Sequence, residues 1–142
     1  MRTSNRVVIA FGSNLGNREK TIAKAIDLIN QECGKVSQVS PFFKSFPIGF
    51  DSNNEFLNGC LLLHTDLPPE QLLKALQNIE QKLGRTRKSS TYEDRCIDLD
   101  IIFYESLILN KPNLQIPHPR YHERPFVIQP LKSLNLDFVI LE

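Results

Sequence analysis

The sequence lacks the features that mark a membrane span, a nucleic-acid-binding domain or a secreted precursor. No apolar run approaches the roughly 18 residues that a membrane helix needs. Seventeen basic residues stand against sixteen acidic ones, giving a net charge of +1, whereas nucleic-acid-binding domains usually carry a basic excess. The opening stretch "MRTSNRVVIAFG" enters a strand pattern directly and does not resemble a signal peptide. We therefore predict no membrane partner and no nucleic-acid partner.

Cysteine is also scarce. Cys33, Cys60 and Cys96 are odd in number, lie far apart and form no C-x-x-C pair, a pattern that favours reduced thiols and a cytoplasmic location. No repeat, low-complexity tract or linker divides the 142 residues, and this length suffices for one hydrophobic core. We predict a single domain over residues 1–142.

Apolar periodicity predicts alternating strands and helices. Strands are expected at residues 6–12, 35–49, 55–66 and 95–105. A first helix follows the first strand, with Asn17 as N-cap and Gly34 as C-cap, and a second helix opens at Pro68 and Pro69. Pro41 interrupts the second strand, which is therefore an edge or bulged strand. The order β-α-β-β-α-β predicts an α+β fold, a ferredoxin-like antiparallel sheet in an α/β sandwich, with additional C-terminal strands and a short helix.

Two aspartates occupy the apolar fourth strand, "RCIDLDIIFYE". Because strand side chains alternate between faces, Asp98 and Asp100 point the same way, about 7 Å apart, and Leu99 points the other way. Two adjacent carboxylates require a cation. Arg95 could neutralise one of them, or both could hold Mg²⁺, which prefers oxygen ligands. The arginine-rich loop "GRTRKSSTYEDR" leads directly to them, and guanidinium groups suit phosphate oxygens. Paired carboxylates beside arginines favour phosphoryl transfer.

Five segments occur in one order that resembles a known family. They are "FGSNLGNR", "FLNGCL", "IEQKLGRTR", "DRCIDLDIIF" and "IPHPRYHERPFVIQPL". Together they resemble the 6-hydroxymethyl-7,8-dihydropterin pyrophosphokinase family of folate biosynthesis, over about residues 7–131. The resemblance implies a ferredoxin-like α/β sandwich and a cytoplasmic, monomeric transferase. Its substrates would be ATP and the hydroxymethyl dihydropterin, and its reaction would move the β,γ-diphosphate of ATP to the hydroxymethyl group, releasing AMP.

The resemblance also implies roles at the phosphate end of the site. Asp98 and Asp100 would hold two Mg²⁺ ions that bridge the ATP phosphates, with Arg85 and Arg95 as further catalytic residues. The residues implied for nucleotide binding are Gln77, Glu80, Arg87, Ile101 (through its backbone), His118 and Arg124. The alternatives are a solvated helix face for Gln77 and Glu80, and a structural hydrogen bond for His118.

The resemblance further implies a pocket for the pterin ring. Phe56 and Phe126 would sandwich the ring, although phenylalanine more often belongs to a core, and Asn58 would donate and accept along the amide edge of the pterin. The other residues implied in this pocket are Ser45, Phe46, Ile48 and Tyr92, the first three largely through backbone. The stretch "GSNLG" lacks the Gly-Lys-Ser/Thr of a P-loop, and we expect it to shape the pocket floor.

The sequence departs from the usual family pattern in two places. Tyr92-Glu93-Asp94 stands where many members carry Trp-Gly-Pro, and the loop between Gly49 and Phe56 lacks the usual prolines. We still expect the loop from Arg85 to Asp94 to close over the substrates.

Two other functions are alternatives to the pyrophosphokinase. A non-catalytic ferredoxin-like RNA-binding module would need a basic excess, and a two-metal nuclease would not need ATP.

Overall fold

The computed structural model describes residues 4–14, 16–45, 55–84, 97–136 and 138. The strands of its main sheet are β1 (Asn5–Ser13), β2 (Lys35–Val39), β3 (Phe43–Ser45), β4 (Phe56–Thr65) and β5 (Asp98–Tyr104). The helices are α1 (Arg18–Glu32), α2 (Pro69–Lys82) and α3 (Pro125–Ser133). A small hairpin of β6 (Leu109–Lys111) and β7 (Leu114–Ile116) and a 3-10 turn, η1 (Tyr121–Glu123), connect β5 to α3.

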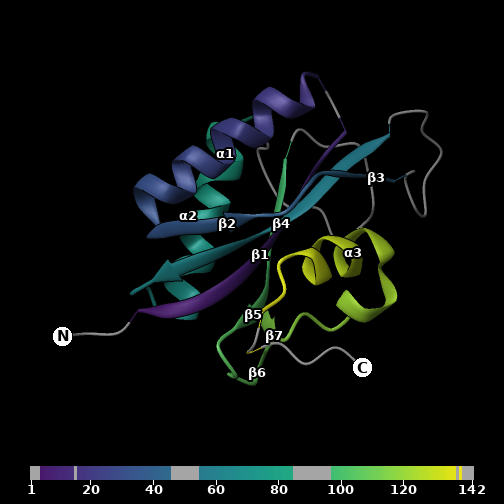
Figure 1. Ribbon diagram of the computed structural model, residues 1–142. Coiled ribbons are helices and arrows are strands. Elements are labelled where there is room, and N and C mark those ends of the chain that lie inside the picture. The colour runs from purple at the N-terminus through teal and green to yellow at the C-terminus, as the bar shows by residue number, and fades with distance from the viewer. Residues whose placement is uncertain (1–3, 15, 46–54, 85–96, 137, 139–142) are drawn as a thin grey trace.

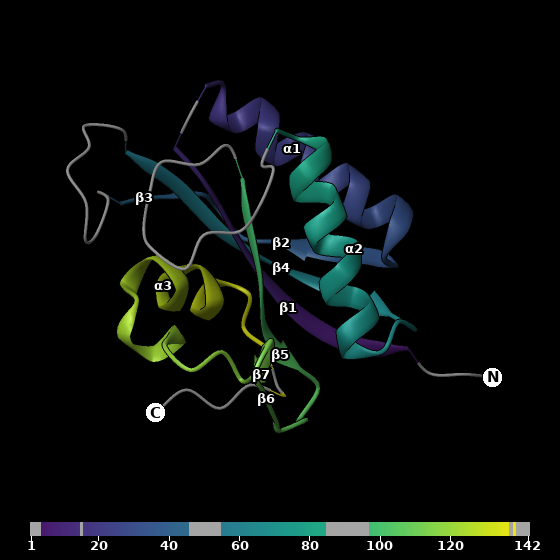
Figure 2. The same cartoon turned by 180° about the vertical axis from the view of Figure 1, so that it is seen from behind.

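The main sheet is antiparallel and runs in the order β2-β4-β1-β5, with β3 also pairing with β4. Helices α1 and α2 lie side by side on one face of the sheet, and α3 lies on the other face (Figures 1 and 2). This is the ferredoxin-like arrangement predicted from the order of the elements. The additional hairpin and short helix after β5 are confirmed as well.

Alternation along the strands builds a separate core on each face. Under α1 and α2, Val7, Ile9 and Leu61 pack with apolar helix residues such as Ile22 and Leu76. The core on the other face joins the sheet to α3 and contains Val8, Ala10, Cys60, Ile102, Phe103, Val127, Leu131 and Leu134. Each central strand therefore contributes to both cores, so polar side chains are concentrated at the two ends of the sheet.

The proline and capping residues of the sequence mark most boundaries of helices and strands correctly. Pro41 lies between β2 and β3, so the interruption predicted there is confirmed. Asn17 caps α1, because its side-chain oxygen accepts a hydrogen bond from the backbone N–H of Lys20 at 3.1 Å. The predicted C-cap is wrong by one residue: Cys33 is the cap and Gly34 follows it. Gly34 has φ +153° and packs against the backbone of His64.

Polar contacts close the end of the sheet formed by Asn5, Thr65 and Tyr104, which we call the far end. The Thr65 hydroxyl donates to the carbonyl oxygen of Cys33 at 2.5 Å and accepts from Leu67 N–H at 3.0 Å. The Tyr104 hydroxyl donates to the Leu67 carbonyl at 2.7 Å and accepts from the Asn5 amide at 2.9 Å. These bonds join strands to the connections that lead into β2 and α2.

Candidate active site

The opposite end of the sheet, at Ser13, Leu57 and Asp98, brings the predicted polar residues together, and we call it the site end. In the strand register, Gly12 of β1 stands between Asn58 of β4 and Asp98 of β5. In the next row of this face, Ala10 stands between Cys60 and Asp100. Because alternate residues share a face, Asn58, Asp98 and Asp100 all lie on the α3 face of the sheet. The side-chain direction predicted for the two aspartates is confirmed.

Small residues separate these polar groups. A Cβ atom on Gly12 would lie 3.0 Å from Oδ1 of Asn58 and 3.8 Å from Cδ1 of Phe56. The absence of a Cβ on Gly12 therefore allows the amide oxygen of Asn58 to lie close against β1, and half-buried Asp98 stands on the other side of Gly12. The expectation that "GSNLG" shapes the pocket floor stays a prediction.

The side chain of Asn58 is buried and held by β3. Its Nδ2 donates to the carbonyl oxygen of Phe43 at 3.1 Å and to Oγ of Ser45 at 2.8 Å. Ser45 and Asn58, which were both predicted for the pterin pocket, are therefore neighbours through the Ser45 hydroxyl, and the contact predicted between the Ser45 backbone and the pterin stays a prediction. Phe56 begins β4 opposite Ser45 and is half-buried, and it belongs to neither core cluster.

Glu80 lies inside the protein, so the alternative of a solvated helix face is wrong for this residue. It is 3 % exposed, and its Oε2 accepts a hydrogen bond from Leu99 N–H at 2.8 Å. Leu99 stands between the two aspartates, so this hydrogen bond joins α2 to the part of β5 that carries them. Gln77 is half-buried one turn earlier. The i, i+3 spacing showed that the two share a helix face but gave no sign of this burial.

The segment after β7 runs along β5. The backbone N–H of His118 donates to the carbonyl oxygen of Ile102 at 3.0 Å, and Nδ1 of His118 accepts from Arg120 N–H at 3.2 Å. Ile102 is an additional residue in β5, because the pairing with β1 shifts at this point. The alternative of a structural hydrogen bond for His118 therefore holds in part, since its half-buried ring accepts from Arg120 N–H while its backbone bonds β5.

Helix α3 begins beside this segment with an arginine and an aromatic residue. Arg124 is the N-cap, and its guanidinium carbon lies 5.9 Å from the ring centroid of Phe126. Phe126 packs partly against the core under α3. Ile101 is 3 % exposed and its side chain belongs to the α1/α2 core, so only its backbone could face a ligand. Arg124 and Phe126 thus lie at the start of α3, on the face that bears the aspartates.

Six predicted site residues lie outside the described residues. They are Phe46, Ile48, Arg85, Arg87, Tyr92 and Arg95. The predicted loop closure from Arg85 to Asp94 falls there too. Among the described residues, no group of three or more His, Cys, Asp or Glu side chains could hold a metal ion.

The described thiols are unsuited to nucleophilic chemistry. Cys60 points to the α3 face next to Ala10, but it is buried and its Sγ hydrogen-bonds the carbonyl oxygen of Val127 at 3.8 Å. Burial raises the pKa of Cys60 to about 12 and the pKa of Cys33 to about 11. Both are free cysteines that remain protonated near neutral pH.

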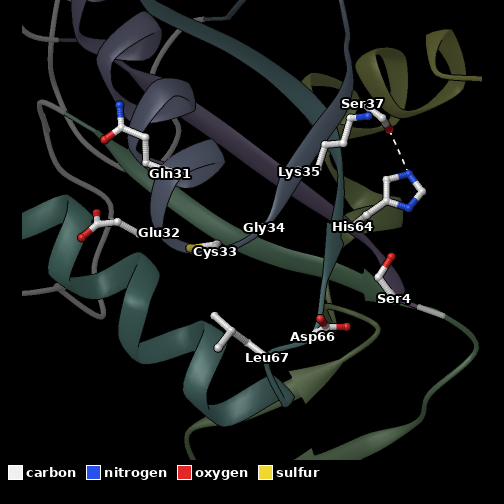
Figure 3. Close-up of a pocket in the computed structure, with 10 residues that line it drawn as sticks. All are labelled: Ser4, Gln31, Glu32, Cys33, Gly34, Lys35, Ser37, His64, Asp66 and Leu67. Carbon is white, nitrogen blue, oxygen red and sulfur yellow. Dashed lines mark hydrogen bonds between the residues drawn. The ribbon is translucent and has the colours of Figure 1, made fainter. Parts of the chain in front are cut away.

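A separate cavity of about 660 Å³ lies at the far end, away from these residues (Figure 3). Glu32 and Cys33 border it from the end of α1, and Asp66 and Leu67 border it from the connection after β4. In this cavity, His64 and Ser37 hydrogen-bond each other at 3.0 Å. None of the predicted site residues lines it, so the cavity and the site occupy different ends of the sheet.

The fold and the site end define the general class of protein. A ferredoxin-like sheet displays two carboxylates on one face at a strand end, in line with Gly12 and an amide fixed by β3. Paired carboxylates on one strand face are typical of phosphoryl-transfer enzymes. Separately, none of the described helices is long and apolar enough to cross a membrane.

The chain belongs to the 7,8-dihydro-6-hydroxymethylpterin-pyrophosphokinase family, whose family model matches residues 8–136. It is 37% identical over 131 residues to the 2-amino-4-hydroxy-6-hydroxymethyldihydropteridine pyrophosphokinase of Porphyromonas gingivalis, covering 90% of this chain and 89% of that protein. The Bacillus subtilis protein of the same name is 37% identical, over 92% and 78% of the two chains. The predicted family and enzyme class are confirmed.

Longer proteins also match. The folic acid synthesis protein of Pneumocystis carinii is 46% identical over 133 residues, which cover 94% of this chain and 18% of that protein. Among solved structures, wild-type Plasmodium falciparum HPPK-DHPS has a TM-score of 0.73 at 13% identity, covering 94% of this chain and 41% of that one. At this identity, the structural match supports the fold alone. The chain therefore corresponds to one section of these larger proteins.

Family membership fixes the reaction. The chain is an ATP-dependent diphosphotransferase that acts on 6-hydroxymethyl-7,8-dihydropterin in folate synthesis, with ATP as co-substrate. The alternatives of an RNA-binding module and a nuclease find no support in these relatives. The roles of individual residues rest on other grounds and are argued next.

Proposed function

We propose that the site end carries out this transfer, with Asp98 and Asp100 at the phosphate end and Asn58 at the pterin end. The observation that supports this proposal is the register row in which Gly12 separates Asn58 from Asp98 on one face of the sheet. A small substrate lying over Gly12 would contact the amide at one end while its hydroxymethyl group approached the carboxylates.

The residues at Asp98 and Asp100 fit magnesium. Their donors are hard carboxylate oxygens, and the β1 residues opposite them, Gly12 and Ala10, are small enough to leave room beside them. Two carboxylates cannot complete a metal cage, but Mg²⁺ usually keeps waters and phosphate oxygens in its shell. We propose that these residues hold two Mg²⁺ ions, which when bound neutralise charge on the ATP phosphates.

We propose that the pterin binds beside Gly12, next to Asn58. Asn58 would accept a hydrogen bond from the ring, and the half-buried rings of Phe56 and Phe126 would cover its faces. Ser45 and, beyond the described residues, Phe46, Ile48 and Tyr92 would complete the pocket. Asn58 is largely buried, and a hydrogen bond made at a buried edge is stronger than one made in water.

The nucleotide would occupy the side of β5 that carries the His118 segment. His118 and Arg124 are half-buried, and a guanidinium offers paired donors to phosphate oxygens. Nδ1 of His118 accepts a hydrogen bond from Arg120 N–H at 3.2 Å, which holds the ring beside the segment that we propose contacts ATP. We also propose nucleotide contacts from Gln77, Glu80 and the Ile101 backbone, with Arg85, Arg87 and Arg95 facing the phosphates.

These residues would accelerate transfer mainly by positioning. Asn58 fixes one end of the pterin, so its hydroxymethyl oxygen can be held in line with the β-phosphorus of ATP. The fastening of Leu99 by Glu80 holds the aspartates in place while charge shifts on the phosphates. We further propose one catalytic domain over residues 1–142, acting as a cytoplasmic monomer without nucleic acid.

The direct test is incubation of the protein with ATP, Mg²⁺ and 6-hydroxymethyl-7,8-dihydropterin, followed by chromatography of the nucleotides. We expect AMP only when all three are present, and loss of AMP formation when the metal is chelated. Variants Asn58→Ala and Asp98→Asn then test which residues form the pterin end and the phosphate end of the site, by measuring the binding of each substrate and the formation of AMP. Equal losses of pterin and ATP binding in Asn58→Ala would contradict the proposed pterin pocket.

A further inference from the structure

The amide of Asn58 has only one possible orientation. Its Nδ2 lies 3.1 Å from the carbonyl oxygen of Phe43, an atom that can only accept hydrogen bonds. The amide NH₂ must therefore face β3, where it also donates to Oγ of Ser45 at 2.8 Å. Exchanging the oxygen and nitrogen would place two carbonyl oxygens against each other.

This orientation determines what Asn58 can offer to a ligand. Both amide hydrogens are used within the protein, so Oδ1 is the remaining hydrogen-bonding atom of the side chain. A Cβ atom on Gly12 would lie 3.0 Å from Oδ1, so the oxygen lies on the side of Asn58 that faces β1, away from β3. Both Nδ2 hydrogens of Asn58 are bonded within the protein, so we infer that Asn58 accepts from the pterin edge, whereas the expectation that it also donates there stays a prediction.

We propose that Ser45 is a positioning residue whose hydroxyl holds Asn58 as a pure acceptor, so that the site selects a ring presenting an N–H group to Oδ1. The proposal rests on the pterin pocket proposed above. Ser45 lies on the short strand β3, and Asn58 lies on the central strand β4. The hydrogen bond between them thus determines that Asn58 presents an acceptor to the ligand. In this proposal, Ser45 acts through Asn58 and not through a contact of its own with the ligand.

Ser40 provides a matched control. It is a buried serine on the same side of β4, and its Oγ accepts a hydrogen bond from Cys60 N–H at 2.9 Å and donates to the Pro41 carbonyl at 2.8 Å. Replacing Ser40 removes a buried hydroxyl that bonds β4 but does not contact Asn58. Any general loosening of this edge of the sheet would therefore affect Ser40→Ala and Ser45→Ala alike.

The experiment measures the Kd of the dihydropterin by calorimetry, in the presence of Mg²⁺ and a non-hydrolysable ATP analogue. We expect Ser45→Ala to weaken pterin binding about threefold to tenfold, the effect of losing one hydrogen bond. The Kd of the ATP analogue should change less than twofold. Ser45→Thr, which keeps the hydroxyl, should restore pterin binding, and Ser40→Ala should leave it within twofold of the unmodified protein.

A double-mutant cycle separates this proposal from the pocket itself. If Ser45 acts through Asn58, adding Ser45→Ala to Asn58→Ala should weaken pterin binding by less than a further factor of two. A full additional loss in that background, or no loss in the single Ser45→Ala variant, would overturn the positioning role while leaving the pocket intact. An unchanged pterin Kd in Asn58→Ala would instead overturn the pocket.

Discussion

The two ends of the sheet use polar residues in opposite ways. At the far end, the side chains of Thr65 and Tyr104 each accept and donate hydrogen bonds within the protein. At the site end, Asp98 and Asp100 share one face as like charges, and the amide oxygen of Asn58 lies close to Gly12 while its NH₂ group bonds β3. The far end thus uses neutral groups that bond each other across connections, whereas the site end gathers like charges on one face, which is a destabilising arrangement that a ligand can justify.

The difference predicts that substitutions at the two ends separate stability from activity. The largest effect should come from Asp98→Asn or Asp100→Asn, each nearly isosteric but without charge. We expect kcat to fall about 100-fold or more, because a charged group at the phosphates is removed, with an unchanged far-ultraviolet circular dichroism spectrum. Asp66→Asn makes the same change at the exposed far end and should retain activity. An active Asp98→Asn enzyme at ordinary Mg²⁺ concentration would remove the metal assignment.

Gly34→Ala should produce the converse result at the far end. A Cβ atom there would lie 2.1 Å from the carbonyl oxygen of His64, and φ is +153°. We expect a loss of about 3 kcal/mol in the free energy of unfolding, measured by urea denaturation, with unchanged kcat for the molecules that remain folded.

Gly16→Ala is the comparison variant for that change. Gly16 has φ +66°, but a Cβ atom there would meet nothing within 4 Å, so only the backbone preference of about 1 kcal/mol is lost. Equal destabilisation by the two variants would show that the close approach at Gly34 is unimportant.

Glu80→Ala should affect both properties, because Glu80 reaches the site end from a buried position. It leaves Leu99 N–H without its carboxylate partner, which costs about 1–3 kcal/mol of stability. We also expect kcat/KM for ATP to fall about tenfold, since Leu99 lies between the aspartates. Glu80→Gln keeps an acceptor and should lose less of both. Wild-type kcat/KM in Glu80→Ala would show that the anchoring of β5 does not matter for transfer.

The smallest effect should come from the ion pair of Arg6 and Glu105 at the far end, whose charged atoms are 3.0 Å apart. The side-chain hydrogen bond from Arg6 holds the pKa of Glu105 below its ordinary 4.5, against a smaller opposing effect of burial. A depressed folded-state pKa gives stability that is present above the unfolded pKa and is lost as pH falls through the folded one.

Glu105→Gln should therefore lower the free energy of unfolding by about 1 kcal/mol or less near pH 7, since the pair is partly exposed. The difference from the unmodified protein should shrink as the pH falls below about 4.5. A difference that stays constant down to pH 3 would mean that the charge of Glu105 contributes nothing.

The elements and their order could be predicted because their signals are local. Asn17 caps α1, Pro41 divides β2 from β3, and the alternation around Leu99 put both aspartates on one face. Each of these inferences needs only the residues of one segment. The family resemblance, and no local pattern, assigned residues from distant segments to one site.

What the sequence could not provide depends on register between segments. The bond from Asn58 to Ser45 exists because β3 pairs with β4 in one alignment, with Phe43 opposite Asn58. Glu80 appears polar and exposed in a helical pattern, yet the packing of α2 on β5 buries it. Both contacts join residues at least 13 positions apart, and no spacing rule within one element predicts them.

The register row of Asn58, Gly12 and Asp98 also fixes a distance across the sheet. Neighbouring strands lie about 4.8 Å apart, so the backbones of Asn58 and Asp98, two strands apart, are separated by about 10 Å. Backbone hydrogen bonds set this length, and side chains can adjust it only slightly. A ligand recognised at Asn58 must therefore place its reacting atom near Asp98 within that fixed span. The sheet would thus choose its substrate partly by size, before any atom of that substrate reacts.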